Sequence, residues 1–376
     1  MALYALVGDV LAPEAIGPAA VVIRDAKILD VVRSPRPADL PRERREVSGL
    51  ICPGFIDLQI NGAFGVEVEP DPKPLETLTR KLPKTGVTSF LPTAISWPAE
   101  RYDLFLEALK NASRSSGARI LGGHVEGPFL APTRKGAHDP ANLRPVDPEL
   151  ARRLVGSGMV RVMTLAPELP RAREAIRLLS EAGVVASAGH TDAGYEEVLR
   201  AIDAGLSMSP LKHRAPGAVG ALLAEDRVGI IADDVHVHGG ALRVAYRQKG
   251  PGGLALVTDA MEAAGMPPGE YELSGRKVRL GDGAVRLPDG TLAGSALTMD
   301  RAVSNTVELL RFPLQDAVRM ATKTPAEVLD MPEKGRIVPG ADADLTVLTP
   351  DGVVEETIVA GGTIHRRRGE DDGHRT

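Results

Sequence analysis

Short apolar runs separated by amphipathic stretches fill the middle of the chain. Amphipathic stretches such as 193–205 place apolar residues at helical spacing and end on a glycine. The runs themselves are compact, as buried strands are, and span 54–60, 87–93, 119–127, 160–167, 184–191, 228–237 and 254–260. This alternation predicts repeated βα units and an α/β fold with a parallel sheet.

The two chain ends follow a different pattern. Residues 1–50 and 335–365 hold short β-branched runs with turn signals between them, which is typical of antiparallel strands. The length of 376 residues accommodates one (β/α)8 barrel of about 250 residues and a smaller domain. We therefore predict a TIM-like barrel over 53–334 and a small β domain built from 1–52 and 335–376.

The stretch "DAGLSMSPLKHRAPG" at 203–217 interrupts the barrel pattern. A closed barrel of this kind needs eight strands, and the seven runs leave the sixth to this interval. Only "LSM" follows the glycine at 205 before a serine and a proline. The sixth strand is therefore expected to be shortened or missing, which would leave backbone groups of strands five and seven unpaired.

Composition narrows the class of protein. A formal net charge of −5 gives no electrostatic reason to expect nucleic acid. The single Cys52 excludes an internal disulfide framework and fits a reducing compartment. The first residues lack the basic region of a signal peptide, and no apolar run approaches the ~20 residues that cross a bilayer. We expect a cytoplasmic protein that does not bind membranes.

Polar residues at the ends of the predicted strands suggest chemistry, because barrel strands carry their catalytic residues at these ends. Glu126, His190 and Asp259 end three different runs, and such a set suits a metal ion that activates water beside an acid/base. His124 is expected instead to hydrogen-bond within its strand. The first run carries Gln59 and Asn61, whose neutral amides are poor ligands for a zinc-like ion. No lysine in 160–167 offers a carbamylated bridge, so we expect one metal ion.

These motifs resemble the amidohydrolase superfamily and, within it, the N-acetylglucosamine-6-phosphate deacetylases. The resemblance spans nearly the whole chain, and its most specific pair is "HVEGPF" at 124–129 with "KGAHDP" at 135–140. It is carried also by "PGFIDLQINGAFGV" at 53–66, "SAGHTDA" at 187–193, "HRAPGAVGA" at 213–221, "IADDVHV" at 231–237, "LVTDAM" at 256–261, "LAGSALTM" at 292–299 and "GRIVPGADADLTVL" at 335–348. The last of these implies that the small domain is the β-sandwich of the superfamily.

The resemblance implies deacetylation of N-acetyl-D-glucosamine 6-phosphate to D-glucosamine 6-phosphate and acetate, in amino-sugar catabolism and recycling. Glu126 and His190 would bind the metal, and Asp259 would act as general base toward a metal-activated water and then as general acid toward the amine. His138 would contact the substrate carbonyl. His236 would contact the sugar, together with the backbone of Gly294, Ser295 and Ala296. Gln59 and Asn61, behind the metal ligands, match the single-metal variant of the family.

The resemblance also implies partners and a cofactor. One divalent metal ion per subunit is expected, with zinc as the first choice and iron, cobalt or manganese as alternatives. Arg214 matches an arginine that reaches the substrate phosphate in the neighbouring subunit, which implies a homodimer. Arginine suits this role because its planar fork matches phosphate oxygens.

The match to the family is interrupted at the sixth strand. Family members carry a "THL-aromatic-NAM" motif there, which supplies a third metal histidine and an asparagine for the phosphate, and this chain lacks it. Three explanations stay open at this point: a truncated or mis-assembled deacetylase, a natural variant with a shorter strand over 206–212 and a ligand such as His213 or His236, or an impaired homologue that only binds sugar phosphates. A dihydroorotase-like enzyme is disfavoured by the absent His-x-His.

Overall fold

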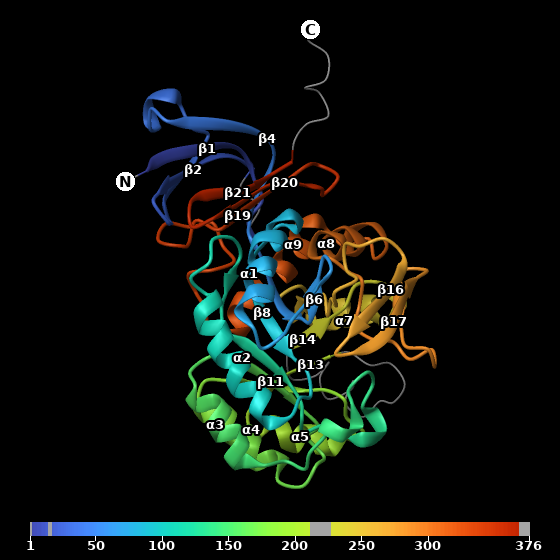
Figure 1. Cartoon of the computed structure of the whole chain (residues 1–376). Coiled ribbons are helices and arrows are strands. Elements are labelled where there is room, and N and C mark those ends of the chain that lie inside the picture. Colours follow the sequence, from blue (N-terminus) through green and yellow to red (C-terminus); the bar gives the residue numbers. More distant parts are fainter. Residues whose placement is uncertain (1, 14–16, 211–226, 368–376) are drawn as a thin grey trace.

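A nearly closed barrel of parallel strands forms most of the molecule (Figure 1). The computed structural model describes residues 2–13, 17–210 and 227–367. An isolated parallel bridge between Ile60 and Ala260 joins the two ends of the strand series. In order around the barrel the strands are β5 (Phe55–Ile60), β8 (Val87–Ala94), β10 (Gly123–Glu126), β11 (Val160–Leu165), β12 (Val185–Ala188), β13 (Leu206–Pro210), β14 (Arg227–Ile230) and β15 (Leu254–Leu256). Each predicted run overlaps one of these strands, so the predicted barrel is confirmed.

The sixth barrel strand is shortened rather than missing, so the first of the two expected alternatives is confirmed. Strand β13 pairs with β12, where Ser187 is opposite Met208. It pairs on its other side with β14, where Met208 is opposite Arg227 and Pro210 opposite Gly229. The serine and proline that seemed to belong to the following loop extend the strand instead. Strands five and seven therefore each have a paired neighbour, and the expected row of unpaired backbone groups does not occur.

Helices cover the outside of the barrel (Figure 1). The predicted helix over 193–205 forms as α5 (Tyr195–Ile202), with Val198 and Ala201 buried, and the chain then turns through Gly205 at φ 106°. The other described helices are α1 (Pro72–Lys81), α2 (Ala99–Ala112), α3 (Pro148–Gly156), α4 (Ala172–Glu181), α7 (Gly239–Lys249), α8 (Met299–Glu308), α9 (Leu314–Ala321) and α10 (Lys323–Val328). None of the helices in the described ranges is long and apolar enough to cross a membrane.

The chain ends meet in one seven-stranded sheet, drawn in blue and red at the top of Figure 1. Strand β4 enters the barrel through Gly54, and the pairing of β4 with β19 joins the N-terminal to the C-terminal strands. The order across the sheet is β21 (Gly362–Arg366), β20 (Val354–Val359), β19 (Leu345–Leu348), β4 (Arg44–Pro53), β1 (Leu3–Val10), β2 (Gly17–Arg24) and β3 (Lys27–Arg33). The sheet has an apolar core of its own, as the prediction of a small β domain from both ends requires.

Small sheets outside the barrel strands complete the fold. Strands β16 (Gly269–Leu273), β17 (Arg276–Gly281) and β18 (Ala284–Arg286) form an antiparallel sheet after β15. Strand β9 (Arg119–Ile120) pairs with β8, and β6 (Gly62–Ala63) pairs with β7 (Val66–Glu67). The β16–β18 sheet, which the sequence patterns did not predict, contacts the loop before His138, because Arg276 donates to the carbonyl oxygen of Ala137 at 2.8 Å.

A buried ionic cluster lies where the small domain meets the barrel. The Lys334 ammonium is 2.9 Å from a carboxylate oxygen of Asp342 and 2.9 Å from one of Asp344, and all three side chains are buried. Lys27 reaches Asp342 from the small domain, and Arg119 reaches both carboxylates from β9. Such a cluster is stabilising only when each charge is paired. The contact between the small domain and the barrel therefore depends in part on a small set of charged side chains.

Candidate active site

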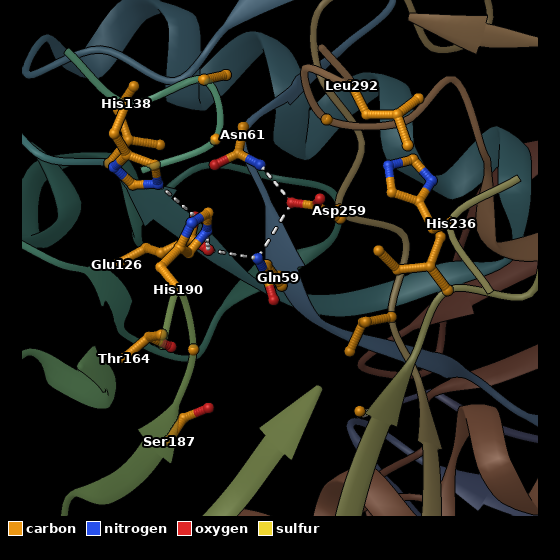
Figure 2. A pocket seen from close by; sticks show the side chains of 18 of the residues that line it. Gln59, Asn61, Glu126, His138, Thr164, Ser187, His190, His236, Asp259 and Leu292 are labelled. Atoms are coloured by element: carbon orange, nitrogen blue, oxygen red, sulfur yellow. Dashed lines mark hydrogen bonds and ion pairs between the residues drawn. The ribbon is translucent and has the colours of Figure 1, made fainter. Parts of the chain in front are cut away.

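A pocket of about 280 Å³ opens at the carboxyl ends of the barrel strands (Figure 2). Parallel strands all end on this side, so side chains far apart in the sequence converge there. Eight of the sequence-predicted residues line the pocket: Gln59, Asn61, Glu126, His138, His190, His236, Asp259 and Gly294.

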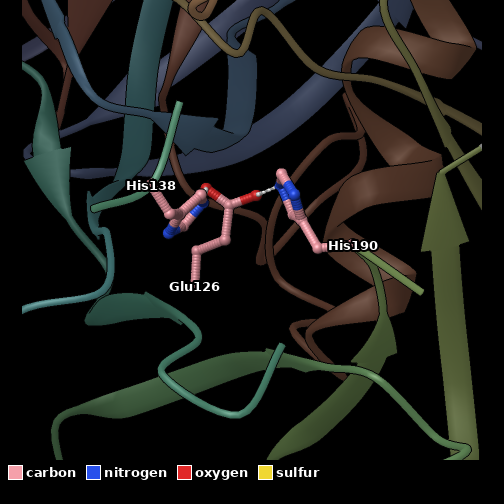
Figure 3. A group of neighbouring side chains, drawn as sticks. All are labelled: Glu126, His138 and His190. Carbon is pink, nitrogen blue, oxygen red and sulfur yellow. Dashed lines mark hydrogen bonds and ion pairs between the residues drawn. The ribbon is translucent and has the colours of Figure 1, made fainter. Parts of the chain in front are cut away.

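Glu126, His138 and His190 lie together on one side of the pocket (Figure 2 and Figure 3). Their ligand atoms all lie within 4.8 Å of one another. One oxygen of Glu126 is 3.2 Å from Nε2 of His190, and the other is 3.8 Å from Nε2 of His138. The sequence predicted two of these residues as metal ligands and the third as a substrate contact, and the structure brings all three together.

Glu126 and His190 are oriented by hydrogen bonds to each other and to the backbone. Burial alone would raise the pKa of Glu126, but the hydrogen bond and charge of His190 outweigh burial and lower it to about 2. The Nδ1 of His190 is 2.8 Å from the carbonyl oxygen of Arg134, so this nitrogen carries the proton and donates it. Nε2 of His190 is the ring nitrogen that faces Glu126, and the carbonyl group on Nδ1 orients the ring in the way found for metal-binding histidines.

The backbone around His190 is tied to the loop that leads to His138. His190 itself has a left-handed conformation, with φ at 50°. Such a conformation is uncommon for a residue with a side chain and occurs often at functional sites. Asp192 accepts hydrogen bonds from Thr133 and from the Arg134 guanidinium. The segment that supplies the carbonyl group to His190 is thus fixed to the residues that follow His190.

His138 is held in a different state, as a hydrogen-bond donor. Its Nδ1 accepts the backbone N–H of Ser96 at 3.2 Å and lies 2.9 Å from the Ser96 hydroxyl. Because a backbone N–H can only donate, the proton of the neutral ring must reside on Nε2. Burial and the charge of His190 lower the pKa of His138 to about 3, so the ring is neutral. The Nε2–H of His138 therefore suits a carbonyl oxygen better than a metal ion.

Asp259 faces this cluster across two side-chain amides. The Gln59 amide nitrogen donates to Oδ1 of Asp259 at 3.1 Å and also lies 3.2 Å from Glu126. The Asn61 amide nitrogen donates to the same Oδ1 at 2.9 Å, as the dashed lines in Figure 2 show. Within the described ranges, Oδ2 of Asp259 has no side-chain hydrogen bond. The two amides thus fix one carboxylate oxygen and leave the other for chemistry.

The electrostatics of Asp259 suit an acid/base. Burial and then the charge of Glu126 raise its pKa to about 7, so both protonation states are accessible near neutral pH. Its backbone is left-handed, with φ at 49°. Asn61 orients Asp259 at a cost in free energy. Its side-chain oxygen is buried and has no hydrogen-bond partner in the described part of the chain.

Other predicted residues are placed less directly. His124 binds the carbonyl of Leu58 and the hydroxyl of Thr164 with its two ring nitrogens, as expected, so it is structural. The backbone N–H of Ser295 donates to the carbonyl of Asp259 at 2.8 Å, which holds the Gly294 turn beside the pocket, while Ser295 and Ala296 are not among the lining residues. Arg214 and His213 lie outside the described residues.

Several lining residues escaped the sequence patterns. Ser187 and Met208 lie on barrel strands five and six, respectively, and Leu273 and Leu292 come from the region around the β16–β18 sheet. The sequence patterns identify where strands end. They do not show which side chains of the region around the β16–β18 sheet point into the pocket. Asp233 is a residue near the pocket that the sequence could have identified, because it is a carboxylate at a strand end, three positions before His236.

The arrangement can perform hydrolysis. A carboxylate–imidazole pair that could hold a metal ion, a neutral hydrogen-bond donor and a carboxylate with a pKa raised to about 7 share one pocket. Together they can polarise a carbonyl group, bind the developing negative charge and transfer a proton.

The chain is similar to known proteins over most of its length. The model of the amidohydrolase family matches residues 50–364. An N-acetylglucosamine-6-phosphate deacetylase of Lysinibacillus sphaericus is 36% identical over 335 residues, 85% of this chain and 87% of the relative. An N-acetylgalactosamine-6-phosphate deacetylase of Escherichia coli O157:H7 is 36% identical over 83% of this chain and 87% of the relative. The crystal structure of the Pasteurella multocida N-acetylglucosamine-6-phosphate deacetylase has a TM-score of 0.91 at 32% identity, covering 96% of this chain and 99% of that chain.

Proposed function

Since this chain belongs to the amidohydrolase family and, within it, to the N-acetylglucosamine-6-phosphate deacetylases, we propose that it hydrolyses N-acetyl-D-glucosamine 6-phosphate. The products are D-glucosamine 6-phosphate and acetate, which places the enzyme in amino-sugar catabolism and recycling. The observation that carries the proposal is the convergence of Glu126, His190, His138 and Asp259 in one pocket. The pKa of Asp259, raised to about 7, suits a group that first takes and later returns a proton.

The donor set fits one divalent metal ion, and we propose zinc, with iron, cobalt or manganese as alternatives. Glu126 is buried, its pKa is lowered by the hydrogen bond from His190, and Nε2 of His190 lies 3.2 Å from one of its oxygens, where an ion would take the place of the shared proton. A carboxylate and an imidazole suit these ions. An ion held there supplies Lewis-acid polarisation of the amide carbonyl and lowers the pKa of water. His236 does not belong to the cluster of ligand atoms that the described residues form.

The other residues of the pocket handle the substrate and its protons. His138 donates from Nε2 to the carbonyl oxygen of the acetamide, where negative charge develops when water adds. Asp259 takes a proton from the attacking water and later transfers it to the amine nitrogen, since an amide nitrogen is a poor leaving group until it is protonated. Gln59 and Asn61 keep Asp259 oriented during both transfers.

An assay of acetate release tests the function. The purified protein, with zinc added, is expected to release one acetate for each N-acetyl-D-glucosamine 6-phosphate consumed. The galactosamine epimer should be assayed in parallel, because a relative acting on it is equally similar in sequence. Absence of turnover on both sugars in protein that holds stoichiometric metal would contradict the proposal. Substrate binding without turnover would favour the impaired homologue instead.

The glutamate ligand gives a prediction of its own. Replacing Glu126 with glutamine is expected to weaken metal affinity by at least about 100-fold, because even outer-shell partners of metal ligands contribute about 10–100-fold. Metal content after dialysis, measured by mass spectrometry, reads this out independently of activity. The matched control is Glu174→Gln on the exposed face of α4, which should retain the wild-type metal content. Retention of full metal content by Glu126→Gln would disprove the ligand assignment.

The remaining substrate contacts and the assembly complete the proposal. We propose that His236 and the backbone of Gly294, Ser295 and Ala296 contact the sugar. We also propose a homodimer in which Arg214 reaches the phosphate in the partner subunit, and light scattering measures that state. The single Cys52, which is buried and unpaired, supports a location in the cytoplasm.

A further inference from the structure

A second carboxylate–histidine pair lies on the side of the pocket away from the metal-ligand cluster. Asp233 and His236 belong to the loop between β14 and α7, and His236 lines the pocket opposite His138 and His190 (Figure 2). The Nδ1 of His236 is 2.6 Å from Oδ2 of Asp233. The other oxygen of Asp233 accepts the backbone N–H groups of Val235 and His236 at 3.0 and 2.8 Å. The carboxylate is therefore held by three donors, one of which is the imidazole.

The pair is enclosed, so its charges interact strongly. The side chain of His236 is 15% exposed and that of Asp233 is 9% exposed. Burial alone would lower the pKa of His236, but the hydrogen bond and charge of Asp233 outweigh burial, and the pKa is raised above its usual value. Asp259 also raises it, while Arg286 on β18 lowers it. The pKa of Asp233 is lowered by the same hydrogen bond despite its burial.

The hydrogen bond decides which nitrogen of His236 serves the pocket. A carboxylate can only accept, so Nδ1 of His236 must carry a proton. Nε2 is then the nitrogen left for a ligand, and it accepts a hydrogen bond while the ring is neutral. Without Asp233, burial would favour the neutral ring, and either tautomer could form.

We propose that Asp233 is a positioning residue of the deacetylase site, which keeps the proton of the neutral His236 ring on Nδ1 so that Nε2 accepts a hydrogen bond from a substrate hydroxyl oxygen. The proposal rests on the proposed function, because the oxygen belongs to the amino-sugar phosphate. It assigns a role to a residue that contacts neither the reacting atoms nor the metal ligands. The alternative is that Asp233 only stabilises the loop through its two backbone contacts.

The variant Asp233→Asn separates these two roles. The amide oxygen of asparagine can still accept the backbone N–H groups of Val235 and His236, so the loop keeps its support. The amide nitrogen would face Nδ1 of His236 in place of the carboxylate oxygen, and it can donate but not accept. The substitution therefore removes the charge and the acceptor while the size of the side chain hardly changes.

The first measurement is the titration of His236 by NMR of its imidazole nitrogens in the ligand-free holoenzyme. In the wild type, the pKa is expected above the usual value of about 6.5, with Nδ1 protonated in the neutral ring. In Asp233→Asn, the pKa is expected to fall by about 1–3 units, with a change of tautomer. The matched control is Asp234→Asn, because Asp234 accepts the N–H of Gly239 and asparagine can do the same. An unchanged pKa and tautomer in Asp233→Asn would overturn the proposal.

Steady-state kinetics supply the second measurement. At a pH above the pKa of His236 in the wild type, Asp233→Asn is expected to raise KM for N-acetyl-D-glucosamine 6-phosphate about tenfold, the loss of one hydrogen bond of about 1.4 kcal/mol, because Nε2 of the variant carries the proton and cannot accept. The ratio of variant to wild-type KM should shrink as the pH falls below the pKa of His236 in the wild type, because protonation of the ring removes the Nε2 acceptor from the wild type as well. A ratio that is independent of pH would indicate a loop role and contradict the proposal. If the wild type does not turn over this sugar, the NMR titration still decides the role of Asp233.

Discussion

Replacing Asp259 with asparagine is expected to lower kcat by about 10²–10⁴-fold, the usual contribution of a positioned acid/base. Asparagine has nearly the same shape, and its side-chain oxygen can still accept the amides of Gln59 and Asn61. It cannot take a proton from water or return one to the amine. The large effect should therefore appear in kcat, while metal content stays at the wild-type level because Asp259 is not among the clustered ligands.

The control for this variant is Asp147→Asn on the barrel exterior. Asp147 is the N-cap of α3 and accepts the N–H of Glu149, and asparagine caps helices about as well as aspartate. Its kcat should stay within about twofold of the wild type. A loss of less than about tenfold in Asp259→Asn would show that another group transfers the proton. Loss of metal in the same variant would assign Asp259 to the metal site instead.

Periodicity predicted the barrel because its strands are buried on both faces. Such strands appear as compact apolar runs, and the amphipathic stretches between them mark the helices. The sixth strand was harder to predict because it is five residues long and includes two serines and a proline. Its pairing depends on the backbones of β12 and β14, which tertiary structure supplies and sequence pattern does not show.

The site was predictable where chemistry coincides with a strand end. Glu126, His190 and Asp259 each follow or end an apolar run, and the family resemblance supplied His138. The residues that set their protonation states were not predictable. The backbone of Ser96 fixes the tautomer of His138, and the carbonyl of Arg134 fixes that of His190. Main-chain groups leave no mark in a residue pattern, since every non-proline residue has both a donor and an acceptor.

The short sixth strand leaves both the barrel and the cluster of possible metal ligands in place. Strand β13 pairs with both of its neighbours and so completes the barrel wall. The three clustered side chains come from β10, from the segment after β12 and from the loop that holds His138. None of them depends on the shortened strand. His138 completes the cluster in space, but its tautomer suits a carbonyl oxygen. The metal assignment in this chain thus rests on Glu126 and His190.

The second large expected effect is a loss of stability rather than of activity. It concerns the buried ionic cluster between the small domain and the barrel. Lys334 is the buried cation of this group and lies between Asp342 and Asp344. Lys27 and Arg119 approach the same carboxylates from more exposed positions, with 52% and 35% of their side chains accessible. Removal of the buried cation leaves two carboxylates that are only partly compensated, and a buried charge without its partner is costly.

Lys334→Met is therefore expected to lower the free energy of unfolding by about 3–5 kcal/mol, although methionine preserves most of the volume. Lys27→Met is the matched control, since it removes a cation from the same Asp342 at a half-exposed position, where an ion pair contributes about 0–1 kcal/mol. Urea denaturation followed by circular dichroism measures both. Adding Asp344→Asn to Lys334→Met should recover part of the loss, because it removes one of the uncompensated charges. Equal losses in the two single variants would show that burial of Lys334 contributes nothing beyond an ordinary surface ion pair.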